Sequence, residues 1–550
     1  MIPLRRGSKA LYRCLSQREL SKLIFLSERR RFYHQSSSSN KDRIPLKGRG
    51  LSREWNFALL GGMLILSYSY FTNYLSSDTI TGIRQYTSSS SSEKSIGQGA
   101  SSNKQNTISL LTDKEVTNRL RDLEQSYFVN RDKGVLRYDV AQLPSNNPIE
   151  DNRIEQVITV PNEDGSSLNV EDLYFFGIFD GHGGPYTSTK LSQDLVHYVA
   201  HQLGKIYSEG TTVLSSQSVD NAITRGFLQL DNDIVLGSLG NLFQHPTKEN
   251  LINALPAISG SCALLAMFDS KTSTLKVATT GDSRVLMGSI DGQGRWTVKA
   301  LSTDQTGDNL EEVARIRREH PDEPNCVRNG RVLGSLQPSR AFGDYRYKVK
   351  ELDGKTVYDL PDHLKIYFRK EPRDFLTPPY VTAEPVITTA HITPETKFMV
   401  MASDGLFELL SNEEIAGLVV KWMQESPVKQ GFEKLASSGV KGKMPPVSDL
   451  SQHKESQRPA FRYKAQQRSS SDYLLEDQNV ATHLIRNALS AGGNKEYVST
   501  LVSIPSPMSR KYRDDLTVTV VFFGNESDLT RVDGQLEMNH DATRRPSPKL

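Results

Sequence analysis

The chain has 550 residues, of which 37% are hydrophobic and 24% charged, and its formal net charge is +3. This length can bury a large core and still leave segments outside it, and the small net charge excludes a general affinity for nucleic acid. The three cysteines, Cys14, Cys262 and Cys326, are too few for a disulfide framework. We therefore expect a folded intracellular protein with additional segments.

The first segment, residues 1–33, is rich in basic residues, and its only acidic ones are Glu19 and Glu28. Arginine and lysine interleaved with Leu, Ile and Phe are typical of a mitochondrial presequence. Arg31-Phe32-Tyr33, which precedes a histidine and a serine run, is similar to a matrix-protease cleavage site. A basic disordered tail is the alternative interpretation.

A largely apolar stretch, residues 55–72, follows a short linker at 34–54. Its length is at the lower limit of the roughly 17–25 residues that cross a bilayer. Tyr68, Tyr70 and Tyr74 suit the membrane interface. We predict one transmembrane segment here, with a buried helix as the alternative, and a Ser-rich linker at 73–106.

The first carboxylates of interest, Glu150 and Asp151, follow the turn-like stretch 143–148. The apolar run 173–179 then predicts a buried strand that ends at Asp180-Gly181-His182-Gly183-Gly184. A strand end would hold the Asp180 carboxylate on rigid backbone, and the glycines would allow close backbone approach. Metal-binding carboxylates are often held in this way.

Similar arrangements recur along the chain. The apolar run 397–403 precedes Asp404-Gly405, and Arg513-Asp514-Asp515 precedes the β-rich run 516–523. Gly281-Asp282-Ser283-Arg284 separates two further apolar runs and also suits a plain hairpin connection. A lone Asp-Gly is usually a turn, so each motif by itself is weak. Apolar periodicity predicts helices over 190–203, 219–236, 309–319, 412–423 and 477–489, and composition predicts a low-complexity insertion at about 424–475.

The carboxylates would repel one another if they met without a cation. Oxygen ligands without a Cys/His cluster favour Mg²⁺ or Mn²⁺ over zinc, and two such ions can activate a bridging water and hold a phosphoryl group for in-line attack. His182 is then suitably placed as general acid, although a structural histidine is the alternative. A cysteine mechanism is disfavoured, because Phe268 and Val332, not arginines, stand six residues after Cys262 and Cys326. The sequence thus predicts a metal-dependent phosphomonoesterase.

The order of these motifs resembles the PPM, or type 2C, family of metal-dependent protein serine/threonine phosphatases over roughly residues 110–525. The motifs that carry the resemblance are Glu150-Asp151, Asp180-Gly181-His182-Gly183-Gly184, Gly281-Asp282-Ser283-Arg284, Gly334 through Asp344, Ser403-Asp404-Gly405 and Arg513-Asp514-Asp515. The resemblance implies an α+β fold, with a central sandwich of two antiparallel β-sheets flanked by helices. Within the family, the stretches 142–151, 340–344 and 378–385 are most similar to mitochondrial pyruvate dehydrogenase phosphatase catalytic subunits.

The resemblance also implies ligands for two metal ions. Asp180 would bridge both ions, and Gly181 would lend its backbone carbonyl to one of them. Asp404 and Asp514 would hold the other ion.

The remaining acidic residues would have indirect or weaker roles. Glu150 and Asp151 would act mostly through metal-bound waters, and Asp282 would serve a weaker third metal site together with Asp404. The chain departs from the family at two positions. Asn146 stands where many members carry an arginine that grips the substrate phosphate, and Glu408 stands where a third-site aspartate often occurs.

In function, the resemblance implies hydrolysis of phosphoserine and phosphothreonine in a phosphoprotein substrate, with pyruvate dehydrogenase indicated by the subgroup. The alternative is an inactive relative that binds phosphoproteins or tethers membranes. Inactive members would be expected to lose metal carboxylates, and this chain retains them.

Location follows from the two ends of the chain. The basic flank before residues 55–72 favours a matrix position for that flank, which would leave the phosphatase domain, residues 107–525, in the intermembrane space. Pyruvate dehydrogenase lies in the matrix, so the two indications conflict. We predict the inner membrane or intermembrane space, with the matrix as the alternative. Residues 526–550 are predicted to be a flexible tail, whose last residues, Pro548-Lys549-Leu550, resemble a peroxisomal signal or match it by chance.

Overall fold

The computed structural model describes residues 109–160, 171–208, 215–425, 444–452, 457, 472–524 and 534–544. All of them belong to the second of two compact units, Lys104–Leu550. The predicted presequence (1–33), the linkers (34–54 and 73–106), the predicted transmembrane segment (55–72) and the terminal tripeptide (548–550) lie outside the described residues. No helix in the described ranges is long and apolar enough to cross a membrane.

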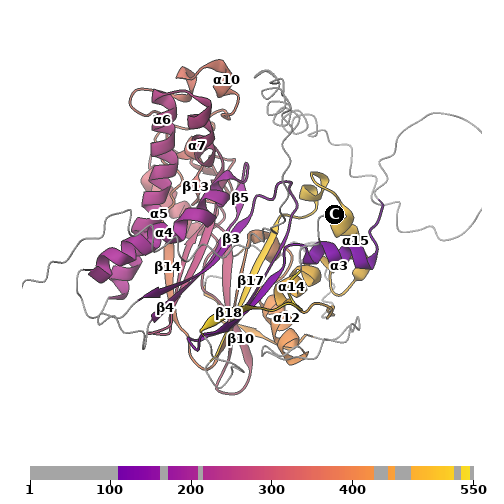
Figure 1. The fold of residues 1–550 in the computed structure, drawn as a ribbon. Helices are drawn as coiled ribbons and strands as arrows, with labels where there is room; N and C mark the ends of the chain where they lie inside the picture. Colours follow the sequence, from indigo (N-terminus) through magenta and orange to yellow (C-terminus); the bar gives the residue numbers. More distant parts are fainter. Residues whose placement is uncertain are drawn as a thin grey trace, which may run out of the picture. The chain divides into compact units, whose positions relative to one another are not determined.

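Two β-sheets form the centre of the described fold (Figure 1). The larger sheet has eight strands, in the order β16 (Ser448–Asp449), β10 (Trp296–Ala300), β9 (Arg284–Ile290), β15 (Thr396–Ala402), β17 (Leu516–Phe523), β2 (Val135–Leu143), β1 (Gln125–Asn130) and β18 (Gln535–Met538). The smaller has five, in the order β14 (Val386–His391), β8 (Thr274–Thr280), β7 (Ala263–Asp269), β4 (Glu171–Phe179) and β3 (Asn152–Val160). Among the described strands of these sheets, only β10 and β16 pair in parallel. The predicted α+β fold with two antiparallel sheets is confirmed.

Side chains on the facing surfaces of the two sheets share one apolar core. Tyr174, Phe176 and Ile178 of β4 pack there with Val521 and Phe523 of β17. The alternate residues of β4, Leu173, Phe175 and Phe179, belong to a second core on the other face of the five-stranded sheet. β4 is therefore buried on both faces, which explains its unbroken apolar sequence.

Helices cover the outer face of each sheet (Figure 1). The five-stranded sheet is covered by α4 (Tyr186–Ser208), α5 (Ser216–Asn232), a π-helical turn (Asp233–Gly237), α6 (Ser238–Gln244) and α7 (Lys248–Ile258). The eight-stranded sheet is covered by α3 (Asp113–Arg121), α11 (Asp404–Phe407), α12 (Asn412–Glu425), α14 (Val480–Leu489) and α15 (Lys495–Ser503). The connections carry α8 (Leu310–Glu319), α9 (Tyr345–Lys348), α10 (Asp362–Lys365) and the 3₁₀ turns η3 (Val357–Asp359) and η5 (Met508–Lys511).

All five predicted helices are present, and side-chain caps mark the N-termini of α5, α8 and α14. Asn479, predicted to lie inside a helix, instead precedes α14 and accepts hydrogen bonds from the Ala481 and Thr482 amides. Asn309 caps α8 in the same way. α7 was not predicted, and it contains Pro256, which interrupts helical periodicity.

Two segments pack more closely than their composition indicates. Residues 534–544 fall in the predicted flexible tail, yet β18 pairs with β1 and Ala542 is fully buried, so the tail prediction is wrong for this part. Within the predicted insertion, β16 adds to the edge of the larger sheet, and Tyr473 and Leu474 are buried in the core beneath α12 and α14. Backbone pairing and a few apolar anchors outweigh a polar composition here.

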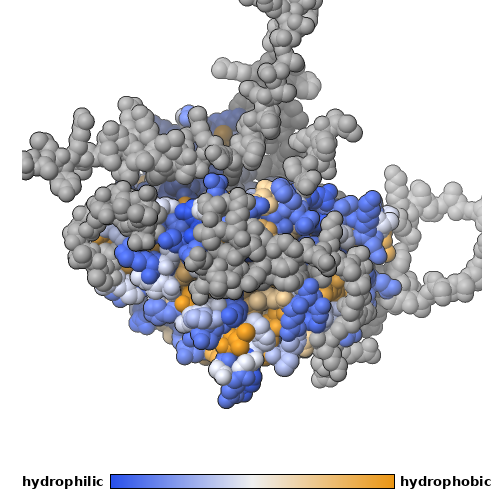
Figure 2. Space-filling view, turned by 60° about the horizontal axis from the view of Figure 1, so that its bottom comes forward, coloured by the Kyte–Doolittle hydropathy of each residue, from blue (hydrophilic) through white to orange (hydrophobic). Residues whose placement is uncertain are grey.

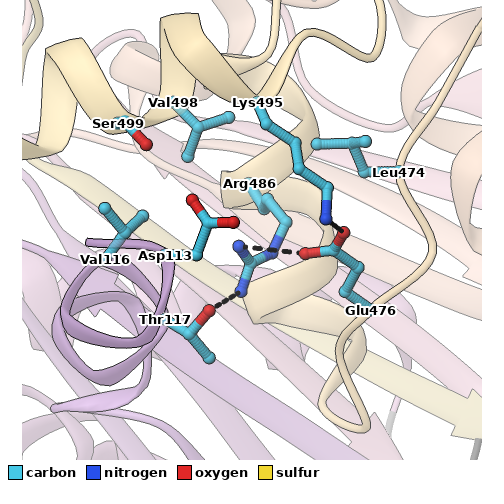
Figure 3. A pocket seen from close by; sticks show the side chains of 9 residues that line it. All are labelled: Asp113, Val116, Thr117, Leu474, Glu476, Arg486, Lys495, Val498 and Ser499. Carbon is cyan, nitrogen blue, oxygen red and sulfur yellow. Dashed lines mark hydrogen bonds and ion pairs between the residues drawn. The ribbon is translucent and has the colours of Figure 1, made fainter. Parts of the chain in front are cut away.

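Figure 2 shows hydrophilic residues over most of the described surface of one face, with apolar patches between them. A pocket lies among α3, α14 and α15, on the outer side of the eight-stranded sheet (Figure 3). Glu476 contacts Arg486 and Lys495 there, and Arg486 also donates a hydrogen bond to Thr117. The Arg486–Thr117 hydrogen bond joins α3 to α14, and the pocket lies apart from the strand ends that carry the predicted site.

Candidate functional site

Three carboxylates that are far apart in sequence meet where strands of both sheets end. Asp180 follows β4, Asp282 lies between β8 and β9, and Asp404 begins α11 directly after β15. One carboxylate oxygen from each of the three lies within 4.8 Å of those of the other two. The structure therefore brings together residues that the sequence separates by more than a hundred positions.

Two further aspartates surround this group. Burial, followed by the charges of Asp151, Asp404 and Asp514, raises the pKa of Asp180 well above its ordinary value. Asp151 is only 2% exposed, and its Oδ2 accepts a hydrogen bond from Thr517 Oγ1 at 2.7 Å. So many buried carboxylates can all be ionised only if cations accompany them.

One arginine lies within this acidic group. Arg510 of η5 forms an ion pair with Asp514, and its side chain keeps 47% of its exposure. Burial lowers the pKa of Arg510, but the charge and hydrogen bond of Asp514, with the charges of Asp404 and Asp180, raise it above its ordinary value. The arginine therefore offers a partly exposed guanidinium beside the carboxylates.

Asp515, which the sequence analysis left without a role, anchors the loop that carries the acidic pair. Its Oδ1 accepts hydrogen bonds from the Ser145 amide (2.5 Å), the Ser145 hydroxyl (2.9 Å) and the Asn146 amide (3.1 Å). Its Oδ2 accepts one from the Glu150 amide at 2.9 Å. The carboxylate next to a predicted ligand thus fixes the position of the 145–150 loop.

The Glu150 side chain bridges two loops. Its Oε1 accepts a hydrogen bond from the Gly184 amide at 2.6 Å, and its Oε2 accepts one from Asn146 Nδ2 at 3.0 Å. Asn146, which stands at the family's arginine position, therefore holds Glu150. The other departure, Glu408, lies at the C-terminal end of α11.

Asp282 is held by neutral donors. Cys262 Sγ donates to its Oδ1 at 3.2 Å, and Gln337 Nε2 donates to its Oδ2 at 3.0 Å. Cys262 is a free, buried cysteine, as predicted, and burial raises the pKa of its thiol well above its ordinary value. Arg284, two residues further on, pairs with Asp304 and lies 4.4 Å from the Phe407 ring centre, which ties this loop to α11.

A small three-stranded sheet completes the site. It has the order β13 (Phe342–Gly343), β6 (Gly260–Ser261) and β5 (Gly181–His182). A Cβ on Gly181 would lie 2.2 Å from the backbone oxygen of Glu150, so only glycine fits there. The Asp180 loop therefore lies directly against the loop of the acidic pair, while the short strands join it to residues 260–261 and 342–343.

His182 has a partner that the sequence analysis did not identify. Its Nε2 lies 2.6 Å from Asp344 Oδ2. Burial is the largest single influence on the pKa of His182 and lowers it, but the charge and hydrogen bond of Asp344, with the charges of Glu150 and Asp282, together raise it more, so the pKa lies above its ordinary value. The only sequence signal was the position of Asp344 at the end of the Arg340 through Asp344 motif.

The donor set at these strand ends consists of carboxylate oxygens, which suits a hard divalent cation such as Mg²⁺ or Mn²⁺. Asp180, Asp282 and Asp404 lie closest together, while Asp514 and Asp151 are near enough to shift the pKa of Asp180. The residues present therefore fit a metal site, with a partly exposed arginine and a histidine beside it.

Comparisons with known proteins agree with this arrangement. The protein phosphatase 2C family model matches residues 146–438. The chain is 56% identical over 577 residues to pyruvate dehydrogenase (acetyl-transferring) phosphatase 1, mitochondrial, of Saccharomyces cerevisiae, covering 100% of this chain and 99% of that protein. It is also 37% identical to a protein phosphatase 2C homolog of Schizosaccharomyces pombe (75% of this chain, 85% of the homolog). A human relative, pyruvate dehydrogenase (acetyl-transferring) phosphatase 2, mitochondrial, is 31% identical (75% of this chain, 82% of the relative).

These matches confirm the predicted family, and the mitochondrial names of two of the relatives support the predicted mitochondrial location. The matched region contains every strand-end motif except Arg513-Asp514-Asp515, and the full-length relative spans that motif too. The chain belongs to the protein phosphatase 2C family of metal-dependent protein serine/threonine phosphatases.

Proposed function

We propose that this mitochondrial phosphatase removes phosphate from serine or threonine residues of pyruvate dehydrogenase. The observation that carries the proposal is the 56% identity, over the full chain, to a relative named for that activity. Purified protein should release phosphate from phosphorylated pyruvate dehydrogenase with a kcat/KM at least about 10-fold higher than from an unrelated phosphoprotein, a preference of about 1.4 kcal/mol. Equal kcat/KM values on both substrates would contradict the substrate assignment but not the phosphatase activity.

We propose that the metal ions are Mg²⁺ or Mn²⁺, held as the family resemblance implies. Asp180 and the Gly181 carbonyl would contact one ion, and Asp180, Asp404 and Asp514 the other. The cluster of carboxylate oxygens supports this assignment. Two such ions, when bound, supply a nucleophilic water near neutral pH and neutralise phosphate charge.

The other acidic residues would act around that centre. Glu150 and Asp151 would reach it through water, and Asp282 would contribute to the third, weaker site. The hydrogen bonds of Glu150 to the Gly184 amide and of Asp151 to Thr517 favour positions fixed by the protein.

The chain's own residues would then bind and protonate the substrate. Arg510 would donate hydrogen bonds to the phosphate, because it is partly exposed, charged and adjacent to Asp514. Arg369 is the second candidate, since its guanidinium nitrogens lie 3.7 and 3.9 Å from the point where a Cβ of Gly183 would stand. His182 would give a proton to the departing seryl or threonyl oxygen.

Removal of the central carboxylates tests the metal assignment. Asp180→Ala and Asp404→Ala should each lower kcat/KM on a phosphothreonine peptide by roughly 10³-fold, a loss of about 4 kcal/mol in transition-state stabilisation. Calorimetric titration with Mg²⁺ and Mn²⁺ should show weaker binding in both variants. Activity that persists in excess chelator, or unchanged metal binding, would contradict the proposal.

We further propose that residues 55–72 anchor the chain in the inner membrane. A pyruvate dehydrogenase substrate requires the catalytic domain to face the matrix, whereas the basic flank favours the intermembrane space. Protease treatment of mitochondria distinguishes the two, because an intermembrane domain is digested after outer-membrane rupture and a matrix domain only after detergent is added. Extraction of the chain by alkaline carbonate would exclude the anchor. Deletion of residues 548–550 tests the peroxisomal pool, which should disappear from fractionated peroxisomes.

A further inference from the structure

His182 and Asp344 form a short side-chain contact in a mostly buried position. The Nε2 and Oδ2 atoms are 2.6 Å apart, and the side-chain exposures are 28% for the histidine and 7% for the aspartate. An ionised carboxylate only accepts hydrogen bonds, so the ring donates from Nε2. No partner of the other ring nitrogen, Nδ1, is found among the residues that the structure describes.

The three-stranded sheet creates room for this contact. In its register, Gly260 of the central strand pairs with His182 on one side and with Gly343 on the other. A Cβ on Gly260 would lie 2.2 Å from His182 Nε2 and 2.3 Å from Asp344 Oδ2. The two side chains therefore meet over a backbone position where any side chain would separate them.

Asp344 is itself held in place from several directions. Its backbone is in the left-handed region (φ 52°), and its amide donates to the Ser259 carbonyl at 2.9 Å. The preceding amide, of Gly343, donates to Asp231 Oδ1 at 2.9 Å, and the other oxygen of Asp231 pairs with Lys348 at 2.6 Å. These bonds fix the Gly343 backbone to α5 and the Asp344 backbone to the end of α7, so the carboxylate presents a constrained acceptor to the histidine.

We infer that Asp344 is a positioning residue that holds the His182 ring by its Nε2 proton and so leaves Nδ1 to protonate the leaving group. This inference rests on the proposed function, in which His182 is the proton donor. As the phosphorus–oxygen bond of the substrate breaks, the seryl or threonyl oxygen takes the Nδ1 proton. The ring, which carries a proton on both nitrogens before this step, is left neutral, with its other proton still on Nε2 and bonded to Asp344.

The dependence on the leaving group tests this role. A threonine alkoxide needs a proton to depart, whereas p-nitrophenolate leaves without one. Asp344→Asn should lower kcat on a phosphothreonine peptide by about 10²-fold, within the range of general acid catalysis, and change kcat on p-nitrophenyl phosphate by no more than about threefold. Asp362→Asn, on a fully exposed side chain of α10, is the matched control and should alter neither rate.

A double-mutant cycle tests whether the two residues act as one unit. Asp344→Asn added to His182→Ala should cause no further loss on the peptide, because the residue that Asp344 holds is already gone. Losses that multiply, or equal losses of Asp344→Asn on both substrates, would overturn the inference and leave Asp344 as a structural residue.

Two readouts apart from turnover complete the design. Calorimetric Mg²⁺ affinity should be unchanged in Asp344→Asn, since Asp344 is not a proposed ligand, and a weakened affinity would overturn the inference. In the wild type, nitrogen NMR of ¹⁵N-labelled histidine, assigned with His182→Ala, should show a proton on Nε2, and an Nε2 without a proton would contradict it. A wild type that fails to hydrolyse the peptide with Mg²⁺ or Mn²⁺ would instead refute the proposed function.

Discussion

The two halves of the site are built in different ways. On the side of the eight-stranded sheet, the loop of the acidic pair is held by hydrogen bonds from three backbone or hydroxyl donors to one Asp515 oxygen and from a fourth to the other. On the side of the five-stranded sheet, the Asp180 loop and the His182 pair are held where glycines permit contact, at Gly181 and Gly260.

This difference has a physical consequence. A loop whose donors bond to a buried carboxylate is destabilised when one acceptor oxygen is removed, because the donors to that oxygen are left unpaired. A close backbone approach fails when a single methyl group is added, because the strands cannot move apart without losing their pairing. The half held by Asp515 should therefore be sensitive to removal of an acceptor, and the half with close glycine contacts should be sensitive to an added methyl group.

Among the substitutions that test this difference between the two halves, Gly181→Ala should have the largest effect. The new Cβ would lie 2.2 Å from the Glu150 backbone oxygen and 2.8 Å from Ser188 Oγ, so the Asp180 loop must shift. A displacement of about 1 Å at a reacting centre can cost about 10²-fold in rate, and we expect a loss of that size in kcat/KM with weaker Mg²⁺ binding. Wild-type kinetics in this variant would show that the close approach is dispensable.

Asp515→Asn should break the other half by removing an acceptor. The NH₂ group of asparagine would face either the Glu150 amide or the Ser145 and Asn146 donors, and the loss of charged hydrogen bonds should lower the free energy of unfolding by about 1.5–3 kcal/mol. Urea denaturation measures this loss, and activity should fall about 10-fold as the acidic pair moves, a cost of about 1.4 kcal/mol. A stable variant with normal activity would show that Asp515 is not needed to hold the loop of the acidic pair.

Arg510→Gln should separate phosphate binding from metal binding. Loss of one charged donor should raise the KM for a phosphothreonine peptide and the inhibition constant of inorganic phosphate by about 10-fold, which corresponds to about 1.4 kcal/mol. Mg²⁺ affinity should not fall, because a competing positive charge is removed from Asp514.

Lys511→Gln is the matched control for that arginine, since it removes the neighbouring exposed cation. It should leave both constants unchanged. A larger effect from Arg369→Gln than from Arg510→Gln would move the phosphate contact to the other half of the site.

The smallest effect is expected from Gly204→Ala, a control for the added methyl group. Nothing lies within 4 Å of a Cβ at this position in α4. Alanine in a helix interior should raise the free energy of unfolding by roughly 0.5–1 kcal/mol without changing kinetics. If it damaged activity as Gly181→Ala does, steric exclusion would not explain the difference between the two glycines.

Much of the fold could be predicted because its local signals are strong. β4, β15 and β17 are apolar runs buried on both faces, and the five predicted helices carry clear apolar periodicity. α7, with its internal proline, and β18, in a polar tail, lack such signals. Their positions depend on contacts with distant parts of the chain.

The sequence by itself determined which residues are proposed to carry the chemistry, because a strand followed by Asp and Gly is a local pattern, and its repetition in a fixed order can be recognised without coordinates. Only the tertiary structure decided which residues support them. Asp515 and Asp344 contact partners 370 and 162 positions away, and Arg510 is influenced by the charges of Asp404 and Asp180. Gly260 has no side chain to separate His182 from Asp344, and no local sequence pattern indicates that these two side chains meet there.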